Sequence, residues 1–243
     1  MAIQTPQAPQ AVLGTLADDL ATTCLALARR FWTGATMWCT APAWPQHAHH
    51  VAVEFVHPVI MGKRALPAVA ITDPDPVSAL RTLARQGDMV VAVADADDPH
   101  VVAAMRRARA WGLETVWIGA GPRPEPGAAD HVLWLADEDP ARAPHVGSFV
   151  LIYHLLWELV HVCFEHPGLL RAENECTDEV CITCSDEGHL GEVVAIGPSS
   201  QATVRTATGP ALIDTTLVAP VGLRDLVLVH AGMAIELVEG AGV

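Results

Sequence analysis

Residues 88–120, DMVVAVADADDPHVVAAMRRARAWGLETVWIGA, contain the repeating unit that decides the fold. Residues 88–94 are an aliphatic run of strand length, and residues 113–118 are expected to form a second strand. Between them, residues 99–111 have a helical pattern with a proline near the first turn. Apolar strands separated by helices are typical of a parallel sheet that is covered on both faces. The segment therefore predicts an α/β fold.

The same alternation continues in both directions from this segment. We expect helices over residues 10–31, 46–61, 77–86 and 145–166, and further strands over residues 35–40, 66–72 and 132–135. Together these elements predict a three-layer, flavodoxin-like α/β domain over residues 1–167, followed by a linker over residues 168–179.

The C-terminal third changes to short alternating segments separated by glycine and proline. Expected strands cover residues 191–196, 202–206, 211–215 and 226–229. Short strands at this spacing are typical of small closed barrels. Residues 180–243 are therefore predicted to form an OB-like β-barrel of five or six strands.

Composition narrows the possible partners. The chain has 51% hydrophobic and 17% charged residues, as a globular protein does, and its formal net charge is −14. Such a surface repels nucleic-acid phosphates and anionic lipids, so we expect neither nucleic acid nor a membrane as partner. No uninterrupted apolar run reaches the ~18 residues of a spanning helix. Residues 1–10 lack the features of a signal peptide, so we expect a cytoplasmic protein.

Histidine and carboxylate side chains recur at helical spacing in the first domain. His50 and Glu54 stand four positions apart, hence on one helix face. Such a pair can bind a divalent cation, or form a solvated ion pair without a metal. His154, Glu158 and His161 also share one face of a later helix. The two sets predict a cluster between two helices that suits iron, manganese, nickel or zinc.

Four segments carry a resemblance to a known family: HVAVE (50–54), KRALPAVAIT (63–72), QGD (86–88) and YHLLWELVH (153–161). Residues 10–167 thereby resemble the sugar isomerase (SIS) domain, and the phosphoheptose isomerases in particular. The resemblance implies that His50, Glu54 and His154 bind zinc or another divalent metal. It also implies catalytic roles for Glu54 and His154 if the domain is an enzyme. A glutamine ligand of the family falls on Val146, and the neighbouring His145 would replace it.

Two loops that bind sugar phosphate in that family differ here. Residues 40–47, TAPAWPQH, contain no glycine, and residues 94–98, ADADD, contain three carboxylates and no hydroxyl. Hydroxyl and free N–H groups bind phosphate, whereas clustered carboxylates repel it. We therefore expect a degenerate sugar-phosphate site. The carboxylates would face a cation or a basic partner, or lie in a solvated turn.

The last helix of the first domain is strongly apolar around its histidines. Its large apolar residues are Phe149, Leu151, Leu155, Leu156 and Trp157. They are expected to pack against the sheet or against a second subunit. Because SIS domains commonly dimerise, the resemblance implies a homodimer or a larger homo-oligomer.

A second motif, VCITCSDE (180–187), opens the predicted barrel, and DLVLVHAGMAI (225–235) closes it. The residues that carry a further resemblance are Cys181, Leu217, Val218, His230, Gly232 and Ala234. They resemble the HypC/HupF family, small β-barrel chaperones that carry the iron–cyanide–carbonyl unit during maturation of nickel–iron hydrogenases. In that family the cysteine lies at the N-terminus, whereas Cys181 is internal and is separated from the first strand by residues 183–189.

This second resemblance implies a site for iron, either alone or with cyanide and carbonyl ligands. Cys181 and His230 would bind the iron, and Cys184 is an additional thiol beside them. The implied partners are the precursor of a hydrogenase large subunit and other maturation proteins.

The cysteine spacing also permits other interpretations. Cys176, Cys181 and Cys184 form C-x4-C-x2-C, which fits a two-iron cluster if Cys163 or an outside ligand completes it. The same thiols with His189 would form a closed zinc site. Without a metal they are reduced thiols of a linker.

These observations lead to three functional hypotheses. The first is an accessory metallochaperone of nickel–iron hydrogenase maturation. The second is a metal-dependent sugar-phosphate isomerase or lyase that uses His50, Glu54 and His154. The third is a scaffold in which the first domain only dimerises the barrel.

Overall fold

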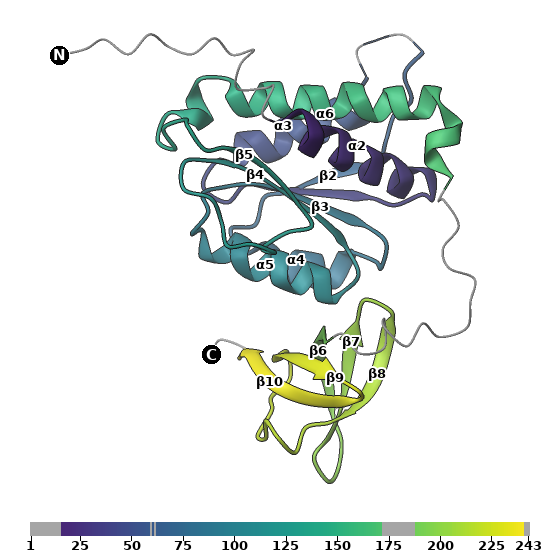
Figure 1. Ribbon diagram of the computed structural model, residues 1–243, viewed down its shortest axis with the longest axis vertical. Helices are drawn as coiled ribbons and strands as arrows, with labels where there is room; N and C mark the ends of the chain where they lie inside the picture. Colours follow the sequence, from purple (N-terminus) through teal and green to yellow (C-terminus); the bar gives the residue numbers. More distant parts are fainter. Residues whose placement is uncertain (1–15, 59, 61, 172–187, 241–243) are drawn as a thin grey trace, which may run out of the picture.

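The computed structural model describes residues 16–58, 60, 62–171 and 188–240, and contains two domains (Figure 1). In the first, a five-stranded parallel sheet has the order β2-β1-β3-β4-β5. Its strands are β1 (Met37–Thr40), β2 (Ala68–Ile71), β3 (Met89–Val93), β4 (Glu114–Ala120) and β5 (His131–Leu135). The direction of winding reverses between β1 and β3, the place where open α/β sheets commonly bind ligands.

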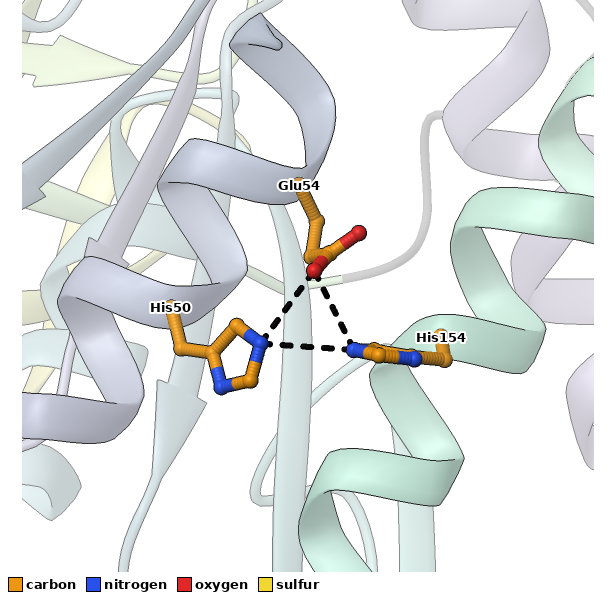
Figure 2. A group of neighbouring side chains, drawn as sticks. All are labelled: His50, Glu54 and His154. Atoms are coloured by element: carbon orange, nitrogen blue, oxygen red, sulfur yellow. Dashed lines mark hydrogen bonds and ion pairs between the residues drawn. The ribbon is translucent and has the colours of Figure 1, made fainter. Parts of the chain in front are cut away.

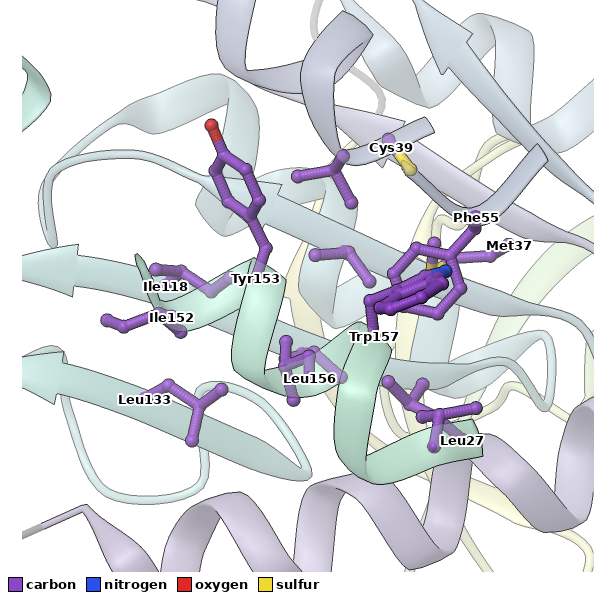
Figure 3. Close-up of a cluster of buried hydrophobic side chains, with 14 of the residues drawn as sticks. Leu27, Met37, Cys39, Phe55, Ile118, Leu133, Ile152, Tyr153, Leu156 and Trp157 are labelled. Carbon is purple, nitrogen blue, oxygen red and sulfur yellow. The ribbon is translucent and has the colours of Figure 1, made fainter. Parts of the chain in front are cut away.

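Helices cover both faces of this sheet. One layer contains α2 (Ala17–Trp32), α3 (Pro45–Val56) and α6 (Ser148–Glu165), and the other contains α4 (Pro76–Leu83) and α5 (Pro99–Ala110). Successive strand residues face opposite layers, so that Met37 and Cys39 pack with the first and Trp38 with the second. Figure 3 shows part of the first core, which includes Phe55 of α3 and Trp157 of α6. The predicted three-layer α/β domain is confirmed.

Three predicted helices were wrong at one end, for local reasons. Helix α4 ends at Leu83 instead of residue 86, because Ala84 has the extended angles φ −76° and ψ 142°. Helix α3 ends at Val56 instead of residue 61, because the residue before Pro58 disfavours helical backbone angles and His57 has φ −120° and ψ 74°. Helix α6 begins at Ser148 instead of residue 145, after the 3₁₀ helix η1 (Ala143–His145) and Gly147 at φ 84°. Gly147 occupies the left-handed region that favours glycine.

Helix α6 is the central helix of its layer. Its length and composition alone would suit a membrane span. In the structure Phe149, Ile152, Leu156 and Val160 are buried in the core that α6 shares with α2 and α3. The side that carries His154 stays exposed, so this face presents a polar group from an otherwise apolar helix.

The second domain is a closed barrel in the order β10-β8-β7-β6-β9. Its strands are β6 (His189–Ile196), β7 (Gln201–Thr206), β8 (Gly209–Asp214), β9 (Leu226–His230) and β10 (Met233–Glu239). Neighbours are antiparallel except β8 and β10, which pair in parallel. Ala231 and Gly232 have φ values of 48° and 78° and join β9 to β10, as expected of a type I′ hairpin turn. The predicted small barrel is confirmed, with β10 as its last strand.

The barrel docks on α4 and α5 through a buried carboxylate. Glu192 of β6 is 1% exposed and accepts hydrogen bonds from Arg81 at 2.6 Å, Arg107 at 3.0 Å and the indole N–H of Trp111 at 2.9 Å. The guanidinium of Arg205 lies over the Trp111 ring, 5.0 Å from its centre. These contacts join the two domains, whereas the exact limits of the predicted linker, 168–179, stay a prediction.

Candidate metal centre

His50, Glu54 and His154 converge on one point between α3 and α6 (Figure 2). Nε2 of His50 and Nε2 of His154 each lie 3.2 Å from Oε1 of Glu54, and the two nitrogens are 3.3 Å apart. The side chains are 38%, 18% and 46% exposed in the order His50, Glu54, His154. Of the residues that the structure describes, this is the group able to offer three or more ligands to one ion.

The packing of the two helices produces this arrangement. In α3, Val51, Ala52 and Phe55 point into the core, which turns His50 and Glu54 toward α6 and the surface. In α6, Ile152, Tyr153 and Leu156 are buried and place His154 on the opposite side. The apolar pattern of each helix thus aims its polar residues at the same gap.

The spacing of the triad fits a bound metal. Zinc bonds to imidazole nitrogen and carboxylate oxygen are ~2.0–2.2 Å long, and a tetrahedral ion with such bonds keeps its ligand atoms ~3.3–3.6 Å apart. The three observed separations of 3.2–3.3 Å lie at the short end of this range. Two histidines and one carboxylate leave a further position open for water or substrate. The same set also suits iron, so it does not select one metal.

Two buried side chains behind the triad complete the site. The hydroxyl of Tyr153 lies 2.9 Å from Nδ1 of His50 and 3.4 Å from Nδ1 of His47. Burial, and then the charge of Glu54, raise the pKa of Tyr153 far above its ordinary value, so the phenol stays protonated. Burial is also the main cause that lowers the pKa of His47, against the opposing effect of its hydrogen bond to Pro144. Burial therefore favours the neutral form of His47.

Sequence reasoning named the residues of the triad but gave no role to Tyr153 or His47. The available signal was spacing: Tyr153 precedes His154, and His47 lies one turn before His50 on the same helix. Only the packing of α3 on α6 shows that the tyrosine hydroxyl lies between the two imidazoles.

Other residues expected near the cluster lie elsewhere. His161 is 2% exposed, and its ring nitrogens face the carbonyl oxygens of Trp157 at 2.8 Å and Arg64 at 2.9 Å. The segment that contains Arg64 covers this part of the helix face, so the predicted inclusion of His161 was wrong. Glu158 and His145 are exposed and outside the group of three. His145 therefore does not supply the ligand position that falls on Val146.

The loop after β3, predicted to be a degenerate sugar-phosphate site, carries negative charge. The carboxylate of Asp98 accepts hydrogen bonds from the backbone N–H groups of His100 and Val101, which caps α5. Burial, and then the charges of Asp97 and Asp98, raise the pKa of Asp95. The first-turn amides of α5 are thus already satisfied, and the surrounding carboxylates repel an anion.

Of the predicted barrel ligands, the structure describes His230. It is the last residue of β9 and half-buried, and the preceding Val229 pairs with His189 at the start of β6. The chain therefore enters the barrel beside His230. Cys181 and Cys184, like Cys176, lie outside the described residues, so the iron site stays a prediction.

Cys163, the fourth ligand considered for an iron–sulfur cluster, belongs to the core of the first domain and is 8% exposed. Burial raises its pKa, which disfavours the thiolate that a cluster requires.

A cleft of about 1020 Å³ lies between the two domains, where the described chain resumes at Gly188. The cations that line it are paired: Arg30 lies 2.8 Å from Glu114, and Arg109 lies 3.1 Å from Asp130. Carboxylates of the same domain therefore compensate these charges, and we assign no ligand to this cleft.

Comparisons with known proteins address the first domain. No family model matches the chain. A phosphoheptose isomerase from Nitratidesulfovibrio vulgaris is 29% identical over 154 residues, covering 56% of this chain and 73% of that protein. The solved phosphoheptose isomerase of Francisella tularensis aligns with a TM-score of 0.53 and 16% identity, over 63% of this chain and 90% of that one. The corresponding structure from Neisseria gonorrhoeae aligns with a TM-score of 0.52 and 16% identity, over 62% and 89%.

These comparisons leave the C-terminal barrel unassigned. Over roughly three fifths of its length, the chain is similar in sequence to a phosphoheptose isomerase and shares the fold of two solved phosphoheptose isomerases.

Proposed function

We propose that the first domain is a divalent-metal-dependent isomerase or lyase that acts on a small hydroxy-carbonyl compound of the sugar class. The observation that carries this proposal is the convergence of two imidazole nitrogens and one carboxylate oxygen at 3.2–3.3 Å on a partly exposed surface. The 29% identity to a phosphoheptose isomerase supports it independently.

Each residue of the triad would have a defined part. His50, Glu54 and His154 would hold the metal, which when bound supplies a Lewis acid for a carbonyl oxygen. Oε1 of Glu54 faces both histidines, and Figure 2 shows the second carboxylate oxygen turned away from them. That oxygen is available to accept a proton from the carbon or hydroxyl next to a carbonyl. Glu54 would thus combine metal binding with general-base catalysis.

The proposed substrate is not recognised through a phosphate in the usual loop. Asp98 occupies the first-turn amides of α5, and Asp95 and Asp97 add negative charge beside them. We infer a substrate that lacks a phosphate at this position. Unphosphorylated aldoses and ketoses are the first compounds to test.

The test compares metal-loaded wild-type protein with Glu54→Gln on a panel of aldoses and ketoses, with and without phosphate. We expect isomerisation of an unphosphorylated member and a loss of about 10²-fold or more in Glu54→Gln, the size expected for removal of a general base. Glu158→Gln, an exposed carboxylate on the neighbouring helix, is the matched control and should keep full activity. Equal rates for Glu54→Gln and wild type would refute the catalytic role.

We propose as a second function that the barrel handles iron for nickel–iron hydrogenase maturation. The observation that favours it is the place of His230, on the strand beside which the chain enters a closed five-stranded barrel. The residues LVLVHAGMAI (226–235) around it carry the resemblance to the HypC/HupF chaperones. A thiolate from Cys181 is the soft ligand that iron with cyanide and carbonyl ligands accepts. The hydrogenase precursor and other maturation proteins would be the partners.

Complementation tests this second function. In a strain that lacks the protein, Cys181→Ala should abolish hydrogenase maturation, His230→Ala should reduce it, and Cys184→Ala should have a milder effect. Glu236→Gln, an exposed side chain of β10 outside the matching residues, is a control and should support full maturation. Full maturation with Cys181→Ala would reject the chaperone function.

A further inference from the structure

A hydrogen-bonded series of buried groups runs behind the metal triad. The carbonyl oxygen of Pro144 lies 3.0 Å from Nε2 of His47, and Nδ1 of His47 lies 3.4 Å from the hydroxyl of Tyr153. The same hydroxyl lies 2.9 Å from Nδ1 of His50. His47 and Tyr153 are buried, at 4% and 0% exposure, so water does not replace these partners.

The first group of the series determines where each proton lies. A carbonyl oxygen only accepts, so Nε2 of His47 must donate to Pro144. Neutral His47 then has a bare Nδ1, which accepts from the hydroxyl of Tyr153. The tyrosine oxygen has given its one proton to His47 and can only accept from Nδ1–H of His50. His50 then carries its proton on Nδ1 and has a lone pair on Nε2. The proton that Oε1 of Glu54 accepts comes in this arrangement from Nε2–H of His154, which lies 3.2 Å from that oxygen and 3.3 Å from Nε2 of His50.

We propose that Tyr153 and His47 are positioning residues that hold His50 in the tautomer able to bind metal. The inference rests on the metal site of the proposed function and adds two residues to it. With the opposite tautomer, Nε2–H of His50 would point into the triad and block the ligand position. A metal-bound histidine commonly donates its other ring N–H to a neighbouring acceptor, which fixes both tautomer and ring orientation. Here a phenol oxygen supplies that acceptor, and His47 fixes the direction of the phenol.

Two variants separate the tautomer from the packing. Tyr153→Phe keeps the buried ring and removes the hydroxyl. His47→Leu keeps an apolar group beside Phe149, whose ring centre lies 5.6 Å from that of His47. The same change frees the tyrosine hydroxyl to donate to His50 instead. Ile152→Val, another buried change on α6 that alters no hydrogen-bonding group, is the control for packing.

The first measurement is the tautomer of His50 in metal-free protein, from long-range ¹H–¹⁵N correlations assigned with His50→Ala. We expect Nδ1–H and a bare Nε2 in wild type and Ile152→Val, and Nε2–H in His47→Leu. The second is zinc affinity by competition with a chromophoric chelator, in protein with Cys176, Cys181 and Cys184 changed to serine. Tyr153→Phe and His47→Leu should each bind about tenfold more weakly than Ile152→Val, which is the usual effect of losing such a partner.

Tyr153 is the chain's one tyrosine, so a single ¹³Cζ-tyrosine resonance reports on this site. It should shift when zinc is added to wild type and stay unchanged in His50→Ala. The proposal is overturned if wild-type His50 carries its proton on Nε2, or if both variants bind zinc within twofold of Ile152→Val. Absence of zinc binding by wild type would instead reject the metal site, while the tautomer in metal-free protein still decides the role of Tyr153 and His47.

Discussion

The Nε2 atoms of His50 and His154 lie 3.3 Å apart although the two residues are 104 positions apart in the chain. Two imidazoles and a carboxylate at this separation have few protons to share among their lone pairs. A cation is therefore the expected occupant of the space between them. Core packing of α3 against α6 holds the two nitrogens in place. The site is thus a consequence of the apolar faces of these helices.

The surface around the triad predicts a homo-oligomer. Val53, Leu151 and Val146 are 46%, 38% and 55% exposed and lie on the two helices that form the site or just before α6. Burying such apolar side chains favours association. We expect a species larger than the 25.8 kDa chain at micromolar concentration in sedimentation velocity, and a monomer for Val53→Asp. Leu212→Asp, on an exposed side chain of the barrel, should leave the assembly unchanged. A wild-type monomer would contradict this prediction.

The domain interface predicts a large effect of Glu192→Gln. Arg107 is only 5% exposed in its side chain, and this change leaves it with the more exposed carboxylate of Glu239, 3.2 Å away, as its anionic partner among the described residues. Removing one partner of a buried ion pair costs about 3–5 kcal/mol. In chemical denaturation, Glu192→Gln should lower the free energy of unfolding by about this amount. Glu236→Gln, on the exposed side of β10, should change it by less than about 0.5 kcal/mol. Equal stability of the two variants would mean that Glu192 does not hold the domains together.

Glu114 predicts a specific loss of stability in acid. Its hydrogen bond with His131, and next the bond and charge of Arg30, lower its pKa from 4.5 to about 2 against the effect of burial. A lowered folded-state pKa stabilises the fold above the unfolded value, and that contribution is lost as pH falls from 4.5 toward 2. The contribution is at most about 3 kcal/mol at neutral pH.

Unfolding free energies of wild type and Glu114→Gln test this assignment. The difference between them should be largest above pH 5 and should shrink steadily toward pH 3. Glu125→Gln, an exposed carboxylate in the loop after β4, should show no such trend. A difference that stays constant with pH would show that folding does not lower the pKa of Glu114.

The acidic loop after β3 predicts poor use of phosphorylated sugars. Wild type should turn over sedoheptulose 7-phosphate weakly, because Asp95 and Asp97 repel its phosphate. Replacing both by serine removes two charges, supplies hydroxyls and keeps Asp98 as the cap of α5. The ratio of kcat/KM for phosphorylated substrates to kcat/KM for unphosphorylated substrates should be higher in the double variant than in wild type. Robust turnover of the phosphate ester by wild type would contradict this account of the loop.

Local sequence patterns predicted most of the fold, because each element carries its own signals. The aliphatic runs of β3 and β4, the Asp-Pro starts of α4 and α5, and the alternation of the barrel strands are readable without tertiary information. The end of α3 was also readable, from Pro58, and the predicted helix overran it. The docking of Glu192 on Arg81 and Arg107 could not be predicted from local patterns, because its partners are over 80 residues away in the chain.

The candidate site, too, was predictable only in part from local sequence. The spacing of His50 and Glu54 predicts a shared face from helix geometry alone. Bringing His154 to them required the resemblance to a known family. His161 lies on the same face of α6 as His154, yet the segment around Arg64 covers it, and helix periodicity cannot show such a cover. The direction of the hydrogen bonds through Tyr153 required the position of the Pro144 carbonyl.

The central claim is that His50, Glu54 and His154 bind a metal ion, and metal stoichiometry tests it most directly. Zinc would be titrated into the full chain with Cys176, Cys181 and Cys184 changed to serine, so that those thiols do not contribute. His49→Ala, the exposed neighbour of His50 on α3, is the matched control. The account predicts one zinc ion per chain in the parent and in His49→Ala, and none in His50→Ala with Glu54→Gln. Equal stoichiometry in all three proteins would contradict it.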